Sequence, residues 1–320
     1  MSNADFTRNV DDARRLIDNI ERVIVGKRDV VTITVAALLA RGHVLLEDRP
    51  GLGKTILARA LAKSVAGDFK RIQCTPDLLP VDITGYVDPR KETFVRGAIF
   101  ANIVLADEVN RAMPRTQSAL LEAMAETQVS VEGTTHLLPR PFMVIATQNP
   151  VEFRGVNDLP EAQLDRFIVM LTPGYPSKED ERRILTDRLV GDPLDAIEPV
   201  IDCARLQELI AAATRVRIDP RLIDYIIATA RATRTNDQIA MGASPRAALQ
   251  LLNLSRAYAL IKGRSYVWPD DVKSLFRHGL AHRLVPKTVP DASITATEWK
   301  LRIVEELVQR VELPKLSPAT

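Results

Sequence analysis

The stretch that decides the fold is His43-Val-Leu-Leu-Glu-Asp-Arg-Pro-Gly-Leu-Gly-Lys-Thr55. Its apolar start, His43 to Glu47, is typical of a short buried strand, and a helical pattern runs from Lys54 to about Ser64. A strand, a glycine-containing loop and a helix in this order are the context of the phosphate-binding loop, whose pattern is GxxxxGK[ST]. The alternative is a plain tight turn between a strand and a helix.

The residues of this loop have separate expected tasks. Gly51 and Gly53 lack a Cβ, so backbone N–H groups can approach phosphate oxygens closely. Lys54 would reach the β- and γ-phosphates of ATP, and Thr55 would bind Mg²⁺ through its hydroxyl group. The first glycine of the pattern is Asp48 here, and Asp tolerates a left-handed backbone better than most residues, so the loop is expected to close. We expect the nucleotide to contact these positions: Asp48, Pro50, Gly51, Leu52, Gly53, Lys54 and Thr55.

Further short apolar runs alternate with helical patterns in the first half of the chain. The runs are Phe69 to Gln73, Ile103 to Ala106, Phe142 to Thr147 and Phe167 to Leu171. Continuous apolar strands separated by helices indicate a parallel sheet that is covered on both faces, so the fold class is α/β. The pattern changes between Gln128 and Leu138, where a turn around Gly133 predicts an inserted β-hairpin.

The segment Thr172-Pro-Gly-Tyr-Pro176 is the best candidate for a domain boundary. Beyond it no convincing strand is found, and pairs such as Asp219-Pro220 and Ser244-Pro245 resemble helix caps, so we expect four or five helices. The length favours about two domains. We therefore expect a nucleotide-binding domain over residues 1–174 and an all-α domain over residues 175–320.

Two carboxylates follow the apolar strand that begins at Ile103. Hydrolysis of Mg²⁺-bound ATP needs one acid near the metal and a second group that takes a proton from water. Asp107 fits the first task and Glu108 the second; two solvated acids at a strand end are the alternative. Because the carboxyl ends of parallel strands lie together, these acids should lie on the same side as Glu47. Asn149, after the next strand, would hold the attacking water or the γ-phosphate, or else form a simple Asn-Pro turn.

Composition excludes several classes of protein. The 320 residues include 43 Lys and Arg, 41 Asp and Glu, and 46% hydrophobic residues, which excludes wholesale disorder and gives no general attraction to nucleic acid. The two cysteines, Cys74 and Cys203, are far apart, so neither a disulfide framework nor a cysteine zinc site is expected. We find no signal peptide and no run long enough to span a membrane, and we expect a cytoplasmic protein without membrane insertion.

Five motifs in one order carry a family resemblance. They are Gly51-Leu-Gly-Lys-Thr55, Leu105-Ala-Asp-Glu-Val-Asn-Arg-Ala112, Ala146-Thr-Gln-Asn-Pro150, Leu159-Pro-Glu-Ala-Gln-Leu-Asp-Arg-Phe167 and Gly242-Ala-Ser-Pro-Arg-Ala247. Through them the chain strongly resembles the MoxR family of AAA+ ATPases, from Val25 to at least the helix after Pro245. Asp48 also fits, since loops of this family often carry Asp there. The fold implied is an αβα nucleotide-binding domain followed by a helical lid, with ATP and Mg²⁺ as cofactors.

The resemblance implies roles that spacing alone does not assign. Val25 and Gly26 match the position at which this superfamily packs the adenine, and Asn149 matches the polar sensor of the γ-phosphate. Arg166 resembles an arginine finger supplied to a neighbouring subunit, and Arg246 resembles a second sensor that reaches from the lid to the nucleotide. The alternative for both arginines is a plain surface position. Arg166 would then form an ion pair with Asp165.

The resemblance also implies partners. An arginine finger needs a neighbouring subunit, so we expect a homo-oligomeric ring, a hexamer. MoxR-like proteins act as chaperones that mature or activate other proteins, typically together with a protein that carries a von Willebrand factor A domain; the client is unknown. Two segments, Ile83 to Ile99 and Gln128 to Leu138, match family insertions, the first within the second helix. These insertions would face the central pore or a partner, or else cover the core.

Two other functions stay open. One is a DNA-acting AAA+ motor or a magnesium-chelatase-like ATPase subunit, which the net charge of +2 and the absence of an appended DNA-binding module disfavour. The other is a nucleotide-binding scaffold with little turnover, which the intact Lys54, Asp107 and Glu108 disfavour. His278 and His282 share a helix face, but no Glu stands between them, so we expect a surface or half-buried pair rather than a zinc site.

Overall fold

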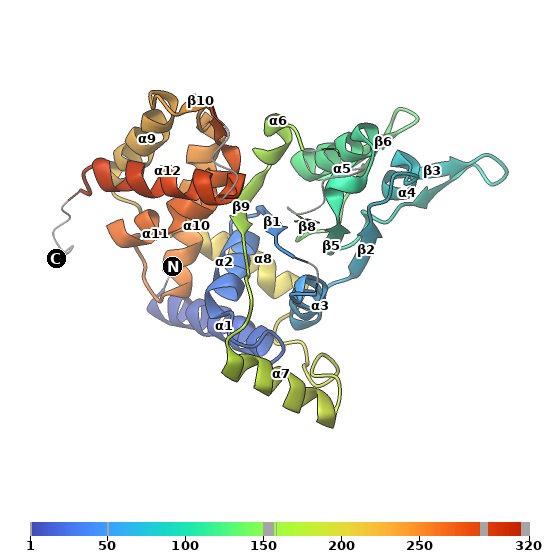
Figure 1. Cartoon of the computed structure of the whole chain (residues 1–320). Helices are drawn as coiled ribbons and strands as arrows, with labels where there is room; N and C mark the ends of the chain where they lie inside the picture. Colours follow the sequence, from blue (N-terminus) through green and yellow to red (C-terminus); the bar gives the residue numbers. More distant parts are fainter. Residues whose placement is uncertain (1, 50, 150–156, 158, 289–293, 315–320) are drawn as a thin grey trace.

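The computed structural model describes residues 2–49, 51–149, 157, 159–288 and 294–314. Five parallel strands form the central sheet in the order β2-β5-β8-β1-β9 (Figure 1). They are β1 (His43–Glu47), β2 (Phe69–Gln73), β5 (Ile103–Asp107), β8 (Met143–Gln148) and β9 (Phe167–Leu171). The predicted parallel α/β sheet is confirmed, and each apolar run in the sequence lies within one residue of its strand.

Side chains alternate between the two faces of the sheet, and each face builds its own apolar core. Val44 and Leu46 of β1 point into the first core, whereas Leu45 between them points into the second. The first core also contains the buried sides of α1 (Asn3–Glu21), α2 (Arg28–Leu39) and α3 (Lys54–Ser64). The second contains the buried side of α5 (Pro114–Glu126). Both faces of β1, β5, β8 and β9 are therefore covered, as continuous apolar strands require, whereas the edge strand β2 is largely exposed.

Helix α1 begins eight residues earlier than its apolar spacing indicates. The pattern predicts a helix from Asp11, but the helix starts at Asn3. Ser2 caps it, because its hydroxyl oxygen accepts the backbone N–H of Asp5 and the Asp5 carboxylate accepts the backbone N–H of Ser2. This capping box extends the helix through a polar first turn that faces solvent.

Six α-helices follow β9 in the described part of the chain, more than the four or five expected. They are α7 (Lys178–Val190), α8 (Cys203–Ala213), α9 (Pro220–Arg234), α10 (Pro245–Ile261), α11 (Pro269–Leu280) and α12 (Ala296–Arg310). The expectation of no strand in this half is wrong, because β10 (Ile239–Met241) and β11 (Val285–Pro286) pair in antiparallel fashion. Strands of three and two residues are too short to show an alternating pattern.

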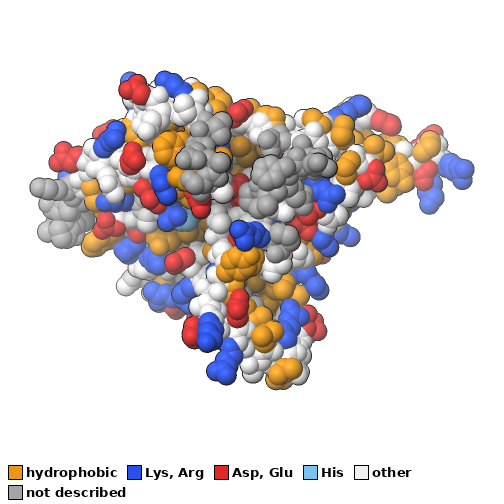
Figure 2. All heavy atoms as spheres, viewed as in Figure 1, with side chains coloured by type: hydrophobic (Ala, Val, Ile, Leu, Met, Phe, Trp, Pro, Cys, Tyr) orange, Lys and Arg blue, Asp and Glu red, His pale blue; other side chains and the backbone are white. Residues whose placement is uncertain are grey.

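The helices α9 to α12 lie together on one side of the sheet, and α7 lies apart from them (Figure 1). Helix α10 packs on α2 and β9, and α11 packs on β9, so this helical part shares the first apolar core with the sheet. The boundary after Gly174 stays a proposal, since one continuous core joins the two parts. Helix α7 has no buried residue; Figure 2 shows apolar side chains at its exposed end, where Leu189 and Val190 are 87% and 92% exposed.

Two β-hairpins project on the side of the sheet opposite the helical part (Figure 1). Their strands are β3 (Gly85–Asp88) with β4 (Thr93–Arg96), and β6 (Gln128–Val131) with β7 (Thr134–Leu137). The predicted hairpin at Gln128 to Leu138 is confirmed. The other insertion follows the short helix α4 (Pro80–Thr84) and is followed by turns, so it does not interrupt one continuous helix. The rings of Phe94 and His136 stack with centroids 3.7 Å apart and thereby join the two hairpins.

Candidate functional site

The loop between β1 and α3 has the geometry of a phosphate cradle. Gly51 and Gly53 adopt left-handed backbone with φ of +84° and +82°, which glycine adopts without strain. Apart from the glycine itself and its chain neighbours, no heavy atom of the described residues lies within 4 Å of the place where a Cβ would stand at either glycine. The space beside both residues is therefore open to an anion, and the start of α3 directs its N–H groups there. Pro50, which the sequence assigns to this loop, lies outside the described residues.

Asp48 fits the loop for a different reason than the sequence suggested. Its φ is not positive, so the tolerance of Asp for left-handed backbone is not used. The side chain is 7% exposed, and its two oxygens accept the backbone N–H groups of Arg49 at 2.8 Å and Gly174 at 2.5 Å. The residue that replaces the first glycine of the pattern thus bonds to the segment that leads into α7.

Lys54 lies half-buried at the start of α3 and donates its Nζ to the backbone oxygen of Asp48. Burial lowers the pKa of Lys54 from its ordinary value, and the carboxylates of Asp48, Asp107 and Glu108 oppose that change. A partly desolvated ammonium group beside an open cradle gains a strong charge-assisted hydrogen bond when a phosphate arrives.

One cavity of about 390 Å³ brings the predicted phosphate, metal and acid residues together. Its lining includes Lys54, Thr55, Asp107, Glu108 and Asn149, so the structure brings together in one cavity five residues that the sequence places on three separate segments. The Thr55 hydroxyl and the Asp107 carboxylate are oxygen donors, the type that Mg²⁺ prefers. The donor set therefore suits a magnesium ion beside a bound phosphate.

Asp107 is held by two side chains, of which Thr147 lies in a quoted motif and Arg71 in none. Thr147 donates its hydroxyl to Oδ1 of Asp107 at 2.7 Å, and Arg71 donates to Oδ2 at 2.6 Å. Arg71 also lines the cavity and is about half exposed. The only sequence signal for Arg71 is its alternate placement with Gln73 on the strand that precedes the acidic strand. Arg71 is thus positioned to compete with a cation for Asp107.

Glu108 is fixed at both its backbone and its carboxylate. Its φ of +56° is unusual for a residue with a side chain, and such strain is often found at active sites. Its backbone N–H donates to the Thr147 hydroxyl at 2.9 Å. Gln73 and Arg111 both donate to Oε2 of Glu108, at 3.1 and 3.0 Å. The carboxylate therefore has a defined position at the rim of the cavity, from which it can accept a proton.

A second cavity of about 490 Å³ adjoins the first, and Gly51 and Gly53 line both. Val25, Tyr175 and Ile184 give it an apolar wall of the kind that suits an aromatic base. Gly26 does not line it. A Cβ at Gly26 would stand 2.1 Å from the Asp180 carboxylate, and the φ of Gly26 is +72°, so glycine is needed there for close approach to α7.

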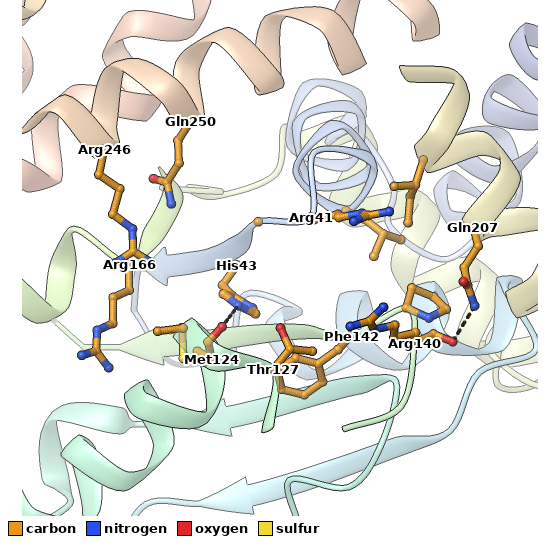
Figure 3. A pocket seen from close by; sticks show the side chains of 15 residues that line it. Arg41, His43, Met124, Thr127, Arg140, Phe142, Arg166, Gln207, Arg246 and Gln250 are labelled. Atoms are coloured by element: carbon orange, nitrogen blue, oxygen red, sulfur yellow. Dashed lines mark hydrogen bonds between the residues drawn. The ribbon is translucent and has the colours of Figure 1, made fainter. Parts of the chain in front are cut away.

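The two predicted arginines do not line either of these cavities. Arg166 and Arg246 line a third cavity, of about 220 Å³, at the amino end of the sheet (Figure 3). Within one chain Arg246 therefore does not line the cavity that holds the phosphate cradle, and its expected reach from the lid to a nucleotide stays a prediction. The packing of α10 on α2 and β9 directs Arg246 toward this opposite end of the strands. Burial lowers the pKa of Arg166, and the charge of Arg246 lowers it further.

The third cavity collects positive charge, and no acidic residue is among the described residues that line it, although Glu122 and Glu126 lie near enough to raise the pKa of Arg166. Figure 3 shows Arg166 and Arg246 on one side of His43, and Arg41 and Arg140 on the other. None of these four arginines forms an ion pair with another residue that the structure describes. No ion pair of Arg166 with its preceding aspartate is found among the described residues; Asp165 instead forms an ion pair with Arg283, with Nε and Oδ1 2.9 Å apart, and accepts a hydrogen bond from the Ser244 hydroxyl. These residues leave the cavity strongly attractive to an anion.

The histidines have structural surroundings. Nε2 of His43 contacts the Met124 carbonyl oxygen at 3.0 Å, and its Nδ1 accepts the N–H of Val144. Burial lowers the pKa of His43 to about 4. His282 is 2% exposed and contacts the Phe167 carbonyl oxygen, so its expected surface or half-buried position is wrong. No cluster of metal-ligating side chains was found among the described residues.

Both cysteines are free thiols, as expected: Cys74 is buried and Cys203 is partly exposed. Among the described residues, no helix combines the length and the apolar character that crossing a membrane requires.

Comparisons with known proteins agree with this geometry. Residues 43–169 match the model of the ATPase family associated with various cellular activities (AAA), and residues 231–301 match the AAA lid domain. The chain is 42% identical to chaperone MoxR1 of Mycobacterium tuberculosis, over 95% of this chain and 82% of that protein. It is 46% identical to the uncharacterized protein YeaC of Bacillus subtilis, over 94% of both. A crystal structure of a protein from Cytophaga hutchinsonii assigned as an ATPase superposes with a TM-score of 0.87 at 34% identity, covering 97% of both chains.

Proposed function

The chain belongs to the MoxR family of AAA+ ATPases, and from this premise we propose that it is a Mg²⁺-dependent ATPase whose turnover drives the remodelling, maturation or activation of protein partners. The observation that carries the proposal is the cavity at the carboxyl end of the sheet. There a lysine, a hydroxyl group and two carboxylates surround an open phosphate cradle. This is the set of groups that phosphoryl transfer to water requires.

Each side chain of that cavity has a task in the proposed reaction. Lys54 leaves the Asp48 carbonyl oxygen and binds the β- and γ-phosphates, while the N–H groups at Gly51 to Gly53 hold the remaining phosphate oxygens. Thr55 and Asp107, which line the cavity, would hold Mg²⁺, and the bound ion would neutralise phosphate charge. Glu108 accepts a proton from the attacking water, and Asn149 orients that water or the γ-phosphate.

The adjoining apolar cavity takes the base of the nucleotide. Val25 and Tyr175 line it, and the two glycines shared with the phosphate cavity give a continuous path for the sugar and phosphates. Gly26 contributes indirectly to the shape of this cavity. Without a Cβ it allows the chain to pass close to Asp180 in the first turn of α7, and Ile184 of the same helix lies on the cavity wall.

Arg166 and Arg246 act on the nucleotide of a neighbouring copy. The two arginines and the phosphate cradle lie at opposite ends of strands about five residues long, or roughly 16 Å apart at about 3.3 Å per residue. Arg166, which directly precedes β9, could reach the cradle of its own chain only if the sheet were disrupted, and Arg246 only if α10 left its packing on α2 and β9. Contact between the amino end of one chain and the carboxyl end of the next supports a closed ring, which we propose is a hexamer.

The finer biological assignments rest on the family alone. We propose that the ring works in the cytoplasm with a protein that carries a von Willebrand factor A domain, and that its client is another protein. MoxR1 of Mycobacterium tuberculosis bears the name chaperone, which supports the class of activity. No observation on this chain favours a DNA-acting motor over this assignment.

The variant Glu108→Gln tests the proposed chemistry. We expect it to bind ATP as the wild type does and to lose turnover by a factor of about 10² to 10⁴, because the amide cannot accept the proton. Phosphate release measures the turnover and calorimetry the binding. Glu312→Gln, an exposed change beyond α12, is the matched control and should keep full activity.

Normal hydrolysis by Glu108→Gln would show that the proton acceptor is misassigned. Absence of ATP binding by the wild type in the presence of Mg²⁺ would overturn the function as a whole. Because Glu108→Gln should retain ATP, affinity capture with this variant and ATP also provides a way to isolate the client and partner.

A further inference from the structure

Asp48 joins the phosphate-binding loop to the segment that leads into α7. Its buried carboxylate accepts the N–H of Gly174 at 2.5 Å, across 126 residues of sequence. Gly174 has a φ of +67°, a left-handed conformation at the end of the sheet part and at the start of the linker. A buried carboxylate gains from a hydrogen bond of this kind more than an exposed one does, because no water replaces it.

Two more residues, Arg49 and Lys27, hold this linker, which consists of Gly174 and Tyr175. Arg49 donates to the Tyr175 hydroxyl oxygen at 3.2 Å, and its guanidinium lies 5.7 Å from the centre of the tyrosine ring. Lys27, which precedes α2, donates its Nζ to the Tyr175 carbonyl oxygen at 2.8 Å. Gly174 and Tyr175 are thus bound from two separate segments, and both residues line the cavity that takes the base.

Asp48 has a second contact, at its backbone. Its carbonyl oxygen accepts Nζ of Lys54, the lysine of the phosphate cradle. A phosphate that takes Lys54 removes this contact from the same residue whose carboxylate holds Gly174. The hydrogen bonds that Asp48 accepts from Lys54 and from Gly174 therefore link the occupancy of the cradle with the position of the linker.

We propose that Asp48 is a positioning residue that couples nucleotide binding to the linker Gly174–Tyr175, and through it to α7. This inference rests on the proposed function, since it takes ATP or ADP as the ligand of the cradle. The residue that stands in place of the first glycine of the loop pattern thus serves regulation rather than the closure of the loop. Glycine at this position would close the loop equally well but would leave the linker without its carboxylate.

Hydrogen exchange of the Gly174 amide measures the coupling directly. In the wild type, the bond to a buried carboxylate should slow exchange of this amide, and saturating ADP with Mg²⁺ should slow it further, because the base packs against Tyr175. In Asp48→Gly, we expect the Gly174 amide to exchange at least about tenfold faster than in the wild type, because one charge-assisted hydrogen bond is lost. The additional slowing by ADP should also disappear at a concentration that calorimetry shows to saturate the variant.

Asp48→Asn is the conservative partner variant and guards against a general folding defect. Its amide oxygen can still accept the Gly174 N–H but carries no charge, so exchange should lie between that of the wild type and Asp48→Gly. Tyr175→Phe removes only the bond from Arg49 and should leave the protection of Gly174 in place. This order of three variants is not expected from a loop that is merely destabilised.

The outcomes separate this inference from the proposed function. Wild-type protein that binds no ADP contradicts the proposed function. Wild-type protein that binds ADP, with a Gly174 amide that exchanges equally in the wild type and Asp48→Gly, overturns the coupling alone. Loss of ADP binding by Asp48→Gly would assign the carboxylate to the nucleotide site itself and would also overturn the coupling.

Discussion

The two ends of the central sheet differ in how their charges are paired. At the carboxyl end, Asp107 is paired with Arg71 and Glu108 with Arg111, so the acids of the site have partners within the chain. At the amino end, four arginines share one cavity, and none of them has an ion pair within the described residues. The acids at the carboxyl end thus have cationic partners within the chain, whereas the four arginines at the amino end have no anionic partner in an ion pair among the described residues.

An anion from a second copy of the chain would resolve this difference. The triphosphate proposed at the carboxyl end of one chain carries the negative charge that the amino end of the next chain lacks. Since the two surfaces are different, the contact is heterologous, and repeated contacts of this type close into a ring when the rotation permits. In such a ring the amino end of one chain and the carboxyl end of the next would form the two halves of one site.

The largest expected effect is that of Arg166→Ala. Turnover should fall by about 10³ or more, whereas ATP should still bind at the cradle of each chain, because the arginine stabilises charge that develops in the transition state. Phosphate release and calorimetry measure the two quantities. Lys54→Ala is the complementary variant and should weaken binding of the nucleotide itself.

Mixing the two variants distinguishes neighbouring chains from isolated ones. A chain with Arg166→Ala retains an intact cradle, and a chain with Lys54→Ala retains an intact arginine, so mixed rings contain complete sites. Activity should reappear at intermediate ratios and be greatest near equal amounts. A complete lack of recovery at every ratio would exclude action between chains.

Acid should destabilise the fold through His43, which lies at the amino end of the sheet. Burial holds the pKa of His43 at about 4, against an ordinary value of 6.5, so the folded protein binds its proton only at lower pH than the unfolded chain does. The contribution of neutral His43 to stability is complete above pH 6.5 and is lost as the pH falls toward 4. This loss amounts to about 3 kcal/mol.

The measurement is the free energy of unfolding in urea between pH 7 and pH 4. Replacement of His43 by Gln removes the titrating group, so the variant should lose about 3 kcal/mol less than the wild type over this range. Equal pH dependence in both proteins would mean that His43 is not held neutral by burial. The buried His43 lies beside Arg246, whose charge lowers its pKa further.

The sequence was sufficient for the carboxyl end and insufficient for the amino end, for a physical reason. The strand beginning at His43, the loop and Asp107 with Glu108 are encoded locally, and parallel strands bring their ends together without further information. The place of Arg246 depends on how α10 packs against α2 and β9, which no local pattern specifies. The sequence identifies the motif that contains Arg246 but not the end of the sheet at which Arg246 lies.

Contacts between strands account for the other residues that were missed. Gln73 and Arg71 lie on an edge strand, and only its pairing with β5 brings them to the acids. The short strands β10 and β11 are too brief to leave a pattern. The early start of α1 depends on a serine cap rather than on apolar spacing. In each case the deciding interaction joins residues that a periodic pattern does not contain.

Arg246→Ala should have a smaller effect than Arg166→Ala. We expect turnover to fall by about tenfold to a hundredfold, the range for one hydrogen bond to a charged group. Mixing with Lys54→Ala should restore activity if Arg246 serves a neighbour, as its position at the amino end supports. Arg231→Ala, an exposed change on α9, is the matched control and should leave turnover unchanged. Loss of turnover that no mixing repairs would assign Arg246 to its own chain.

The smallest expected effect concerns Arg71, which partners Asp107 at the carboxyl end. Its Nη2 lies 2.6 Å from Oδ2 of Asp107, on a side chain that is 49% exposed, so the ion pair is worth at most about 1 kcal/mol. If Arg71 competes with Mg²⁺ for that oxygen, Arg71→Ala should lower the Mg²⁺ concentration that gives half-maximal turnover by up to about fivefold. Arg71→Lys retains a charge and should change it less. A higher Mg²⁺ requirement in Arg71→Ala would instead mean that Arg71 binds the nucleotide phosphates, and the charge pairing that distinguishes the carboxyl end would then belong to the nucleotide-free state only.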